Sequence, residues 1–411
     1  MSIFHPNGHP PHLSRRSALV GAGALFSWSY LPKFAQAAQG RDPRFITIIL
    51  RGALDGLSAV APLGDPSYAS LHGAIALSRD GANAALPLDS FFGLNPAMKH
   101  FAKLYQAKQA AIVHALATPY RERSHFDGQD VLESGMPDKG LVTSGWMNRM
   151  LQALPKGDKV NPQRSGLAVG SVTPLIMRGP APVTGWVPSG MASASDDVAQ
   201  RLLDLYAQRD PVLGQALAQG LGIEKIVARD MGDLKPVGGG VPMMRQVAQG
   251  AAKLLAADDG PRLGALAFDG WDTHANEGGA TGRLAQLLGG LDDAIEEFEK
   301  ALGPKWAQTV IVVVTEFGRT ARINGTIGTD HGTGTVAFLA GGALKGGRVI
   351  ADWPGLKEEQ LFEKRDLKPT TDLRAVLKGI MVEHLGLSAH VLGDKVFPNS
   401  AVLAPLTGLI S

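Results

Sequence analysis

The chain has 411 residues, no cysteine and a formal net charge of +2. The lack of cysteine excludes disulfides, thiolate catalysis and cysteine-ligated zinc, and the near-neutral charge argues against electrostatic binding to nucleic acid or to a membrane surface. A chain of this length can bury one large core or form two domains.

Residues 1–37 have the features of an export signal of the twin-arginine (Tat) type. Arg15 and Arg16 precede a modestly apolar run, and Ala35 and Ala37 form an Ala-x-Ala cleavage pattern. The apolar run is only about 14 residues long, short of the roughly 20 that a membrane-spanning helix needs. We therefore expect cleavage after Ala37, with the Tat translocase and signal peptidase as processing partners. An uncleaved, membrane-tethered form is the alternative.

Cleavage would leave a periplasmic or secreted mature chain. It removes three positive charges (Arg15, Arg16 and Lys33) and no acid, so the mature chain carries −1. Because Tat substrates fold before export, the signal suits a protein that takes up a metal or cofactor first. No other apolar run approaches membrane-spanning length. We therefore expect no membrane segment and no nucleic-acid partner for the mature chain.

Strands and helices are expected to alternate along the mature chain. Short continuous apolar runs predict strands at residues 45–50, 110–116, 167–177 (one or two strands), 263–270, 309–317 and 334–342. Apolar residues at helical spacing predict helices at residues 95–109, 126–135, 143–154, 282–302 and 372–386. A mostly helical block from Ser193 to about Ala257 is predicted as an inserted cap.

This alternation predicts a single α/β domain over residues 38–411, with a mainly parallel sheet covered by helices on both faces. In open sheets of this kind, ligands bind where the strands end. Polar side chains follow four of the predicted strands. They are Arg51 and Asp55; Arg121, Arg123, Ser124, His125, Asp127 and Asp130; Asp272, His274 and Asn276; and Glu316, Arg319, Asp330 and His331.

Carboxylates and imidazoles without thiols indicate a divalent metal site. These residue types suit Zn, Mn, Fe, Ca or Mg, and they do not distinguish among these metals or between one ion and two. In the stretch "GTDHGTG", Asp330 and His331 lie on a glycine-rich loop that lets both turn toward one ion. Nearby arginines would fit a phosphate or sulfate group through bidentate hydrogen bonds.

Each of these residues also has a purely structural interpretation. Asp55 with Gly56 is a common turn pair, Asp272 could cap a helix, His125 could be a hydrogen-bonded core histidine, and Arg121 and Arg123 could be solvated. Because these residues follow four different predicted strands, a common binding site is favoured over the structural interpretations. The other histidines of the mature chain are less promising. His72, His100, His384 and His390 are expected in helical or loop contexts without carboxylate partners, and His114 in the core.

Five stretches resemble the signatures of the family called domain of unknown function 1501, in the same order and over nearly the whole mature chain. They are "FITIILRGALDGLSAVAP", "TPYRERSHFDGQDVLESG", "GWDTHANEGG", "TEFGRTARINGTIGTDHGTG" and "LAGGALKGGRVIADWPGL". That family is grouped with the alkaline phosphatase and sulfatase superfamily. The resemblance implies a three-layer α/β/α fold, a metal site at the strand ends and hydrolysis or transfer of phosphate or sulfate esters.

The resemblance also implies residue roles. Asp55 resembles the superfamily's first-strand metal carboxylate, Asp272 with His274 its Asp-and-His pair, and Asp330 with His331 its late Asp-His pair. Two positions depart from the pattern. The expected nucleophile position, ten residues before a glycine, holds His125 with Ser124 beside it, and Thr333 replaces a histidine that family members often carry.

Two functions remain open at this point. The first is an exported metal-dependent hydrolase acting on a small-molecule phosphate or sulfate ester. Its metal ligands would come from Asp55, Asp127, Asp272, His274, Glu316, Asp330 and His331. Its nucleophile would be Ser124, beside His125, or water, and Arg123 or Arg319 would hold the anion. The second is a non-catalytic exported protein that retains the sulfatase-like fold and binds an anionic polymer or a partner.

Overall fold

A computed structural model describes residues 42–140, 142–154, 166–170, 172–187, 202, 205, 206 and 240–411. Residues 42–411 form one unit by their contacts. The expected signal peptide lies outside the described residues, and so does most of the expected helical insertion at 193–257. Within the described residues, no helix has both the length and the apolar character needed to cross a membrane.

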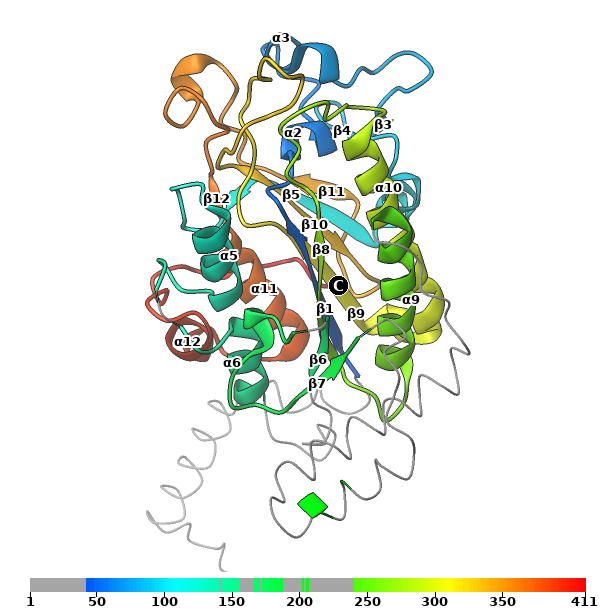
Figure 1. The fold of residues 1–411 in the computed structure, drawn as a ribbon, viewed down its shortest axis with the longest axis vertical. Coiled ribbons are helices and arrows are strands. Elements are labelled where there is room, and N and C mark those ends of the chain that lie inside the picture. The colour runs from blue at the N-terminus through cyan, green and yellow to red at the C-terminus, as the bar shows by residue number, and fades with distance from the viewer. Residues whose placement is uncertain are drawn as a thin grey trace, which may run out of the picture. The chain divides into compact units, whose positions relative to one another are not determined.

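A nine-stranded sheet forms the centre of the unit (Figure 1). Eight strands follow in the order β11-β5-β10-β9-β1-β8-β6-β7, and β12 also pairs with β5. Strand β10 runs antiparallel to both of its neighbours, and the other pairings are parallel. The bounds are β1 Arg44–Arg51, β5 Ala110–Ala117, β6 Gly166–Val169, β7 Val183–Trp186, β8 Leu263–Asp269, β9 Thr309–Val314, β10 Thr335–Ala340, β11 Arg348–Ile350 and β12 Thr371–Asp372.

Helices cover both faces of this sheet (Figure 1). One face packs against α4 Lys99–Gln106, α9 Val241–Ala256 and α10 Arg283–Leu302. The other packs against α5 His125–Ser134, α6 Trp146–Ala153 and α11 Leu373–Leu385. Strand β1 carries apolar side chains on both of its faces. Ile46 and Ile48 enter the first core, and Phe45 and Ile49 enter the second, so both faces of the strand are buried.

Smaller elements flank the edge of the sheet at which β1 ends. They are helices α2 Gly56–Ala59 and α3 Tyr68–His72, and a second sheet in the order β2-β4-β3, from β2 Val60–Ala61, β4 Gly93–Leu94 and β3 Leu86–Pro87. Helix α12 Ala389–Val391 lies elsewhere, beside α6 (Figure 1). The 3₁₀ and π turns are Gly73–Ile75, Leu175–Met177, Gly303–Gln308, Glu358–Gln360 and Leu392–Val396.

The prediction of a mainly parallel sheet between two helical layers is confirmed. Two strand predictions were too long. Within 167–177 the strand ends at Val169, and Leu175–Met177 forms a 3₁₀ turn. The strand predicted at 309–317 ends at Val314, because the next two side chains bond to the loop after β1. Thr315 accepts from the amide of Leu54 (3.2 Å), and Glu316 accepts from the amide of Gly52 (2.9 Å).

Candidate metal centre

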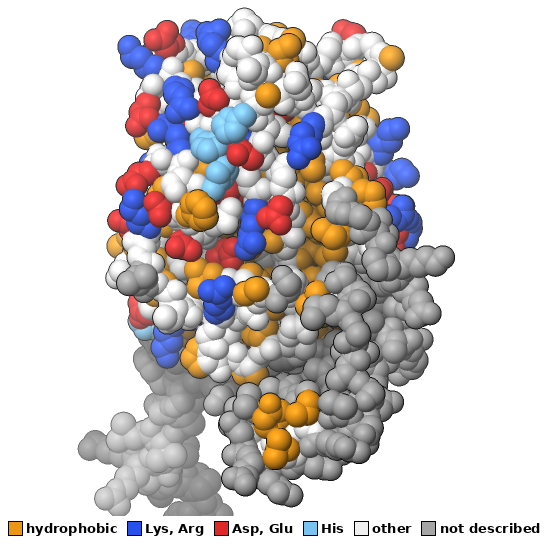
Figure 2. Space-filling model, viewed as in Figure 1, with side chains coloured by type: hydrophobic (Ala, Val, Ile, Leu, Met, Phe, Trp, Pro, Cys, Tyr) orange, Lys and Arg blue, Asp and Glu red, His pale blue; other side chains and the backbone are white. Residues whose placement is uncertain are grey.

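Three segments bring histidines together at the edge where β1, β8 and β9 end and β10 begins. His125 is the first residue of α5, Asp272 and His274 lie in the loop after β8, and His331 lies in the loop between β9 and β10. We call these four residues the histidine cluster. Figure 2 shows histidine side chains gathered on one exposed face, with acidic and basic side chains around them.

The Nε2 atoms of the cluster's imidazoles face one another. His331 Nε2 lies 2.9 Å from His125 Nε2 and 3.0 Å from His274 Nε2. The carboxylate of Asp272 lies 3.0 Å from His274 Nε2, 3.2 Å from His331 Nε2 and 3.5 Å from His125 Nε2. His125, Asp272 and His331 each offer a ligand atom within 4.8 Å of the others. Nitrogen and oxygen donors therefore surround one small volume.

Each imidazole is held from behind at its other nitrogen. His125 Nδ1 lies 2.7 Å from a carboxylate oxygen of Glu316, and His274 Nδ1 lies 3.3 Å from Asp330 Oδ1. His331 Nδ1 lies 3.0 Å from the backbone carbonyl of Arg123. Because all three partners accept, each Nδ1 must carry a hydrogen, which leaves Nε2 with a free lone pair when the ring is neutral. Acceptors placed behind imidazoles in this way are typical of metal-ligating histidines.

The short Nε2–Nε2 distances require a positive charge between the rings. Two neutral rings with hydrogen on Nδ1 would direct lone pairs at each other across 2.9 Å for His125 and His331, and across 3.0 Å for His274 and His331. A proton shared by a pair relieves one such contact, and a metal ion relieves both at once. The geometry of the cluster therefore fits a bound metal ion.

The spacing of the donors also fits. Ligands held tetrahedrally at 2.0–2.1 Å from zinc lie about 3.3 Å apart. The donor atoms of Asp272 and His331 lie 2.9 to 3.5 Å from each other and from those of His125 and His274. A set of imidazoles with one carboxylate suits zinc, iron, copper or nickel better than calcium or magnesium, which prefer oxygen ligands.

Arg319 fixes the position of Asp272. The guanidinium is buried, with the residue 1% exposed, and Nη2 donates to Asp272 Oδ1 at 2.5 Å. Its other donors reach the backbone carbonyls of Gly52 (2.8 Å), Ala53 (2.7 Å), Trp271 (3.1 Å) and Thr329 (3.0 Å). One side chain thus ties together the loops after β1 and β8 and the loop before β10.

Gly52 allows two of these loops to approach closely. Its φ is +121°, and a Cβ placed on it would lie 2.5 Å from the amide nitrogen of Asp272. Only glycine fits this conformation and this approach without a shift of the backbone. The sequence places that glycine directly after β1, so that the Asp272 segment can lie against the end of the strand.

Charges around the cluster set the ionisation of its members. The hydrogen bond that His125 donates to Glu316 raises the pKa of His125 against the effect of burial. Burial lowers the pKa of His331, and the charges of His125 and Arg319 lower it further. Burial alone would raise the pKa of Asp272, but Arg319 and the imidazoles outweigh it, so the pKa is lowered. The carboxylate therefore stays ionised and available to a cation.

Two residues predicted as metal ligands lie behind the imidazoles. Asp330 accepts from His274 and also from the side-chain amide of Asn324 (3.1 Å). Glu316 is fully buried and accepts from His125, from the amide of Gly52 and from the hydroxyl of Thr315 (3.0 Å). Their position is that of groups that orient a ligand.

Asp55 is placed in a separate buried pair. It is 1% exposed, its carboxylate caps α2 through the amides of Leu57 (2.9 Å) and Ser58 (3.2 Å), and it lies 3.3 Å from His72 Nε2. The expectation that His72 has no carboxylate partner is wrong, since its partner lies 17 residues away. His100 and His390 likewise pair with Glu299 and Asp394.

Ser124 and Asp127, which were predicted as site residues, form hydrogen bonds and ion pairs with residues outside the histidine cluster. Ser124 is the N-cap of α5, and its hydroxyl accepts from the amide of Asp127 at 3.5 Å. The carboxylate of Asp127 contacts Lys139 (3.2 Å) and the hydroxyl of Tyr120 (3.4 Å).

The guanidinium of Arg123 pairs with Asp366 (2.7 Å) and Glu363 (2.5 Å). In this segment, His125 belongs to the histidine cluster, and the carbonyl of Arg123 contacts His331.

Sequence reasoning missed three contributors. The carbonyl of Arg123 and the amide of Asn324 act through contacts between distant segments. Arg365 donates to the carbonyl of His331 (2.7 Å) from an exposed side chain. Arg365 lies in the loop that follows β11. The sequence did not indicate it, because it does not come directly after a predicted strand. Thr333, which replaces the family's histidine, is buried and donates to the carbonyl of Leu367 (3.1 Å).

The family described as "Protein of unknown function (DUF1501)" matches residues 42–396. No curated protein matches the chain. Among solved structures, the chain is similar to Ps i-CgsB in complex with k-i-k-neocarrahexaose, at 12% identity and a TM-score of 0.39, over 89% of this chain and 77% of that one. It is also similar to PsFucS1 sulfatase from Pseudoalteromonas sp. (13% identity, TM-score 0.36, 82% and 68%) and to a TAB5 alkaline phosphatase mutant with Mg bound (14%, 0.32, 73% and 92%).

Proposed function

The chain belongs to the DUF1501 family, and from its histidine cluster we propose that it is an exported, metal-dependent hydrolase of phosphate or sulfate esters. One observation carries the proposal. Three imidazoles, each held at Nδ1 by an acceptor, direct Nε2 at one another and at Asp272. This arrangement supports a metal centre at the strand ends of an α/β fold, the edge at which such folds bind ligands.

In this proposal His125, Asp272, His274 and His331 hold the ion. A divalent ion bound there would act as a Lewis acid on an ester oxygen and lower the pKa of water. Glu316 and Asp330 keep two of the imidazoles in the ligating tautomer and raise their basicity. Arg319 holds Asp272 in place and balances its charge.

In this proposal Arg365 binds the phosphate or sulfate group of the ester. The guanidinium groups of Arg123 and Arg319 are engaged by carboxylates and carbonyls and are largely or fully buried. Arg365 bonds to the His331 carbonyl and lies 3.7 Å from Asp366, but its side chain is 41% exposed. An arginine at this rim can offer its remaining donors to a phosphate or sulfate group. The nucleophile remains either the Ser124 hydroxyl or water.

Hydrolysis by the purified mature chain tests the proposal. We expect turnover of aryl phosphates or aryl sulfates that a chelator abolishes and a borderline divalent metal restores. His331→Ala is expected to abolish it, and Arg365→Ala to raise KM more than it lowers kcat. Activity that is unchanged in His331→Ala would contradict the proposal. Ser124→Ala decides the nucleophile, because water as the nucleophile predicts that this variant retains turnover.

A second candidate is a non-catalytic exported binding protein with a structural ion. The observation that favours it is that the Ser124 hydroxyl caps α5 and that Arg123 and Arg319 are both engaged. This candidate predicts bound metal without turnover of any ester. Any hydrolysis that Asp272→Asn abolishes would exclude it.

Export is the remaining part of the proposal. Arg15 and Arg16 with the Ala-x-Ala ending at Ala37 support it. We expect the double substitution Arg15→Lys/Arg16→Lys to leave the chain in the cytoplasm at full length. The wild-type chain should reach the periplasm with Gln39 near its new N-terminus, which intact mass spectrometry of each fraction reads directly. Equal periplasmic amounts of both forms would contradict a Tat route.

A further inference from the structure

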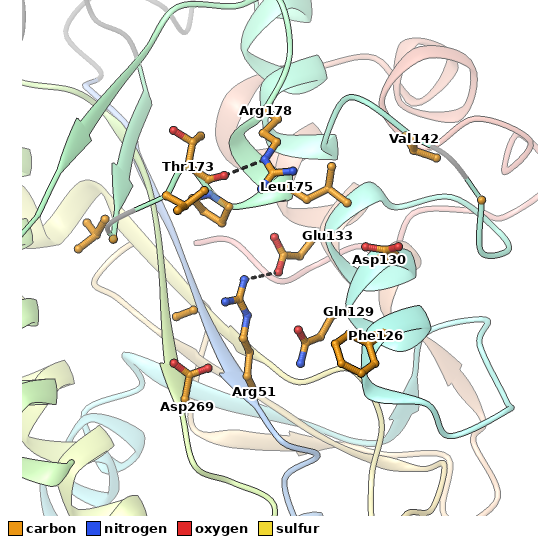
Figure 3. Close-up of a pocket in the computed structure, with 16 residues that line it drawn as sticks. Arg51, Phe126, Gln129, Asp130, Glu133, Val142, Thr173, Leu175, Arg178 and Asp269 are labelled. Atoms are coloured by element: carbon orange, nitrogen blue, oxygen red, sulfur yellow. Dashed lines mark hydrogen bonds and ion pairs between the residues drawn. The ribbon is translucent and has the colours of Figure 1, made fainter. Parts of the chain in front are cut away.

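We infer that a cleft beside the histidine cluster binds a sugar ring, so that the ester acted on is a carbohydrate ester. This inference rests on the proposed function and names its substrate class. The cleft has a volume of about 600 Å³, within the range of sites that hold small ligands. Its walls come from α5 and from the segments after β6, and residues at the ends of β1 and β8 complete the lining (Figure 3).

Two apolar side chains stand exposed at this cleft. Phe126 on α5 is 87% exposed, and Val172 in the segment after β6 is 68% exposed. A single exposed apolar residue is ordinary, but here a whole phenyl ring borders a cleft. The negative face of an aromatic ring attracts the slightly positive C–H groups of a pyranose. Such a ring is a suitable platform for the apolar face of a sugar.

The lining between these side chains is polar and of mixed charge. Its charged residues are Arg51, Arg178, Asp130, Glu133 and Asp269, which leave an excess of one negative charge. Arg51 is paired with Glu133 at 2.6 Å (Figure 3). Vicinal sugar hydroxyls both donate and accept hydrogen bonds, so they can bond to guanidinium groups and to carboxylates.

The same lining argues against two other ligand classes. A nucleotide or other polyanion would meet three carboxylates, which repel it. A lipid would leave the arginines and carboxylates without water and without partners, which is costly. A neutral polyhydroxylated ring with one apolar face avoids both penalties.

The cleft and the histidine cluster share helix α5. Phe126 follows His125 in the chain. Gln129, one turn further, borders the cleft and donates to the Glu316 carboxylate (3.4 Å), which holds His125. In this inference, a sugar stacked on Phe126 directs its ester group toward the cluster, while the rest of the carbohydrate extends along the cleft.

Binding to an array of neutral and singly sulfated oligosaccharides tests this inference. The probe is the mature chain, fluorescently labelled, with and without prior chelator treatment. We expect binding to at least one class of oligosaccharide, at least tenfold weaker for Phe126→Ala and weaker for Asp130→Asn. Val402→Ala, which removes an exposed apolar side chain outside the cleft (99% exposed), is the matched control and should bind normally.

Metal content and aryl-ester turnover of the same variants separate the two claims. We expect Phe126→Ala to keep its metal and its circular dichroism spectrum, while wild-type turnover of aryl esters tests the hydrolase proposal on its own. Absence of binding to every oligosaccharide, or equal binding by wild type and Phe126→Ala, overturns the cleft inference while the hydrolase proposal stands. Oligosaccharide binding without metal or turnover in the wild-type chain would instead overturn the hydrolase proposal.

Discussion

Glu316 acts on the cluster through a single imidazole. It is fully buried, and burial alone would raise its pKa, but its hydrogen bond with His125 and two backbone amides outweigh burial and lower it. The carboxylate is therefore ionised at neutral pH and makes the His125 ring a stronger base. This contact joins residues 191 positions apart in the sequence.

We predict that Glu316→Gln weakens metal binding by about 10–100-fold. The amide still accepts from Nδ1 but no longer supplies the negative charge. Competition with a chromogenic chelator measures the affinity. Glu277→Gln is the matched control, because this buried carboxyl accepts from the Thr329 hydroxyl (2.7 Å) and burial raises its pKa well above the usual value. Equal affinities in the wild type and Glu316→Gln would show that His125 is not a ligand.

Asp55 offers a test that separates stability from metal binding. The family resemblance implies that it ligates a metal, whereas the structure pairs it with His72 in the core. We predict that Asp55→Asn lowers the free energy of unfolding by about 3 kcal/mol and leaves the metal content unchanged. Urea unfolding and metal analysis of the same preparation check both. Loss of the metal with unchanged stability would support the role implied by the resemblance.

The pH dependence of this difference follows from the pKa of Asp55. Burial alone would raise that pKa, but His72 outweighs it, so the folded value lies below the ordinary 3.8. The pair's contribution to stability is therefore complete above pH 3.8 and is lost as the pH falls through the folded value. The gap between wild type and Asp55→Asn should be full at pH 7 and shrink below pH 3.8.

Arg319 connects the elements on which the site is built. Its donors reach the ends of β1 and β8 and the loop before β10. We predict that Arg319→Ala lowers the free energy of unfolding by at least about 3 kcal/mol, because several buried carbonyls lose their partner, and that metal affinity falls with it. Arg322→Ala, on the exposed side of the same loop, should stay within about 0.5 kcal/mol of wild type. A stable Arg319→Ala protein with full metal content would show that the loops hold their positions independently.

The strand ends could be predicted from the sequence because strand patterns are local. Apolar runs located β1, β5, β8, β9 and β10, and the polar residues after them included all four members of the histidine cluster. Which polar residues would face a metal ion, and which would lie behind the imidazoles, could not be predicted. Whether Asp330 touches the ion or the back of His274 depends on a contact between loops 56 residues apart. The pairing of Asp55 with His72 depends likewise on how α3 packs on α2.

In the unit as a whole, one edge of the sheet combines the histidine cluster and the cleft. β1, β8 and β9 end at this edge, and α5 contributes to both features. The antiparallel β10 brings His331 to that edge from the opposite direction. Folding before export, as the twin-arginine signal predicts, would let the cluster take up its ion in the cytoplasm.

The most direct test is the metal content of the exported mature chain, purified without chelator and measured by mass spectrometry. The account predicts about one borderline divalent ion per chain in the wild type and in Asp55→Asn, and almost none in a His274→Ala/His331→Ala double variant that is still folded. A metal-free wild-type chain, or equal metal in the double variant, would contradict it and leave the short Nε2–Nε2 contacts to a shared proton.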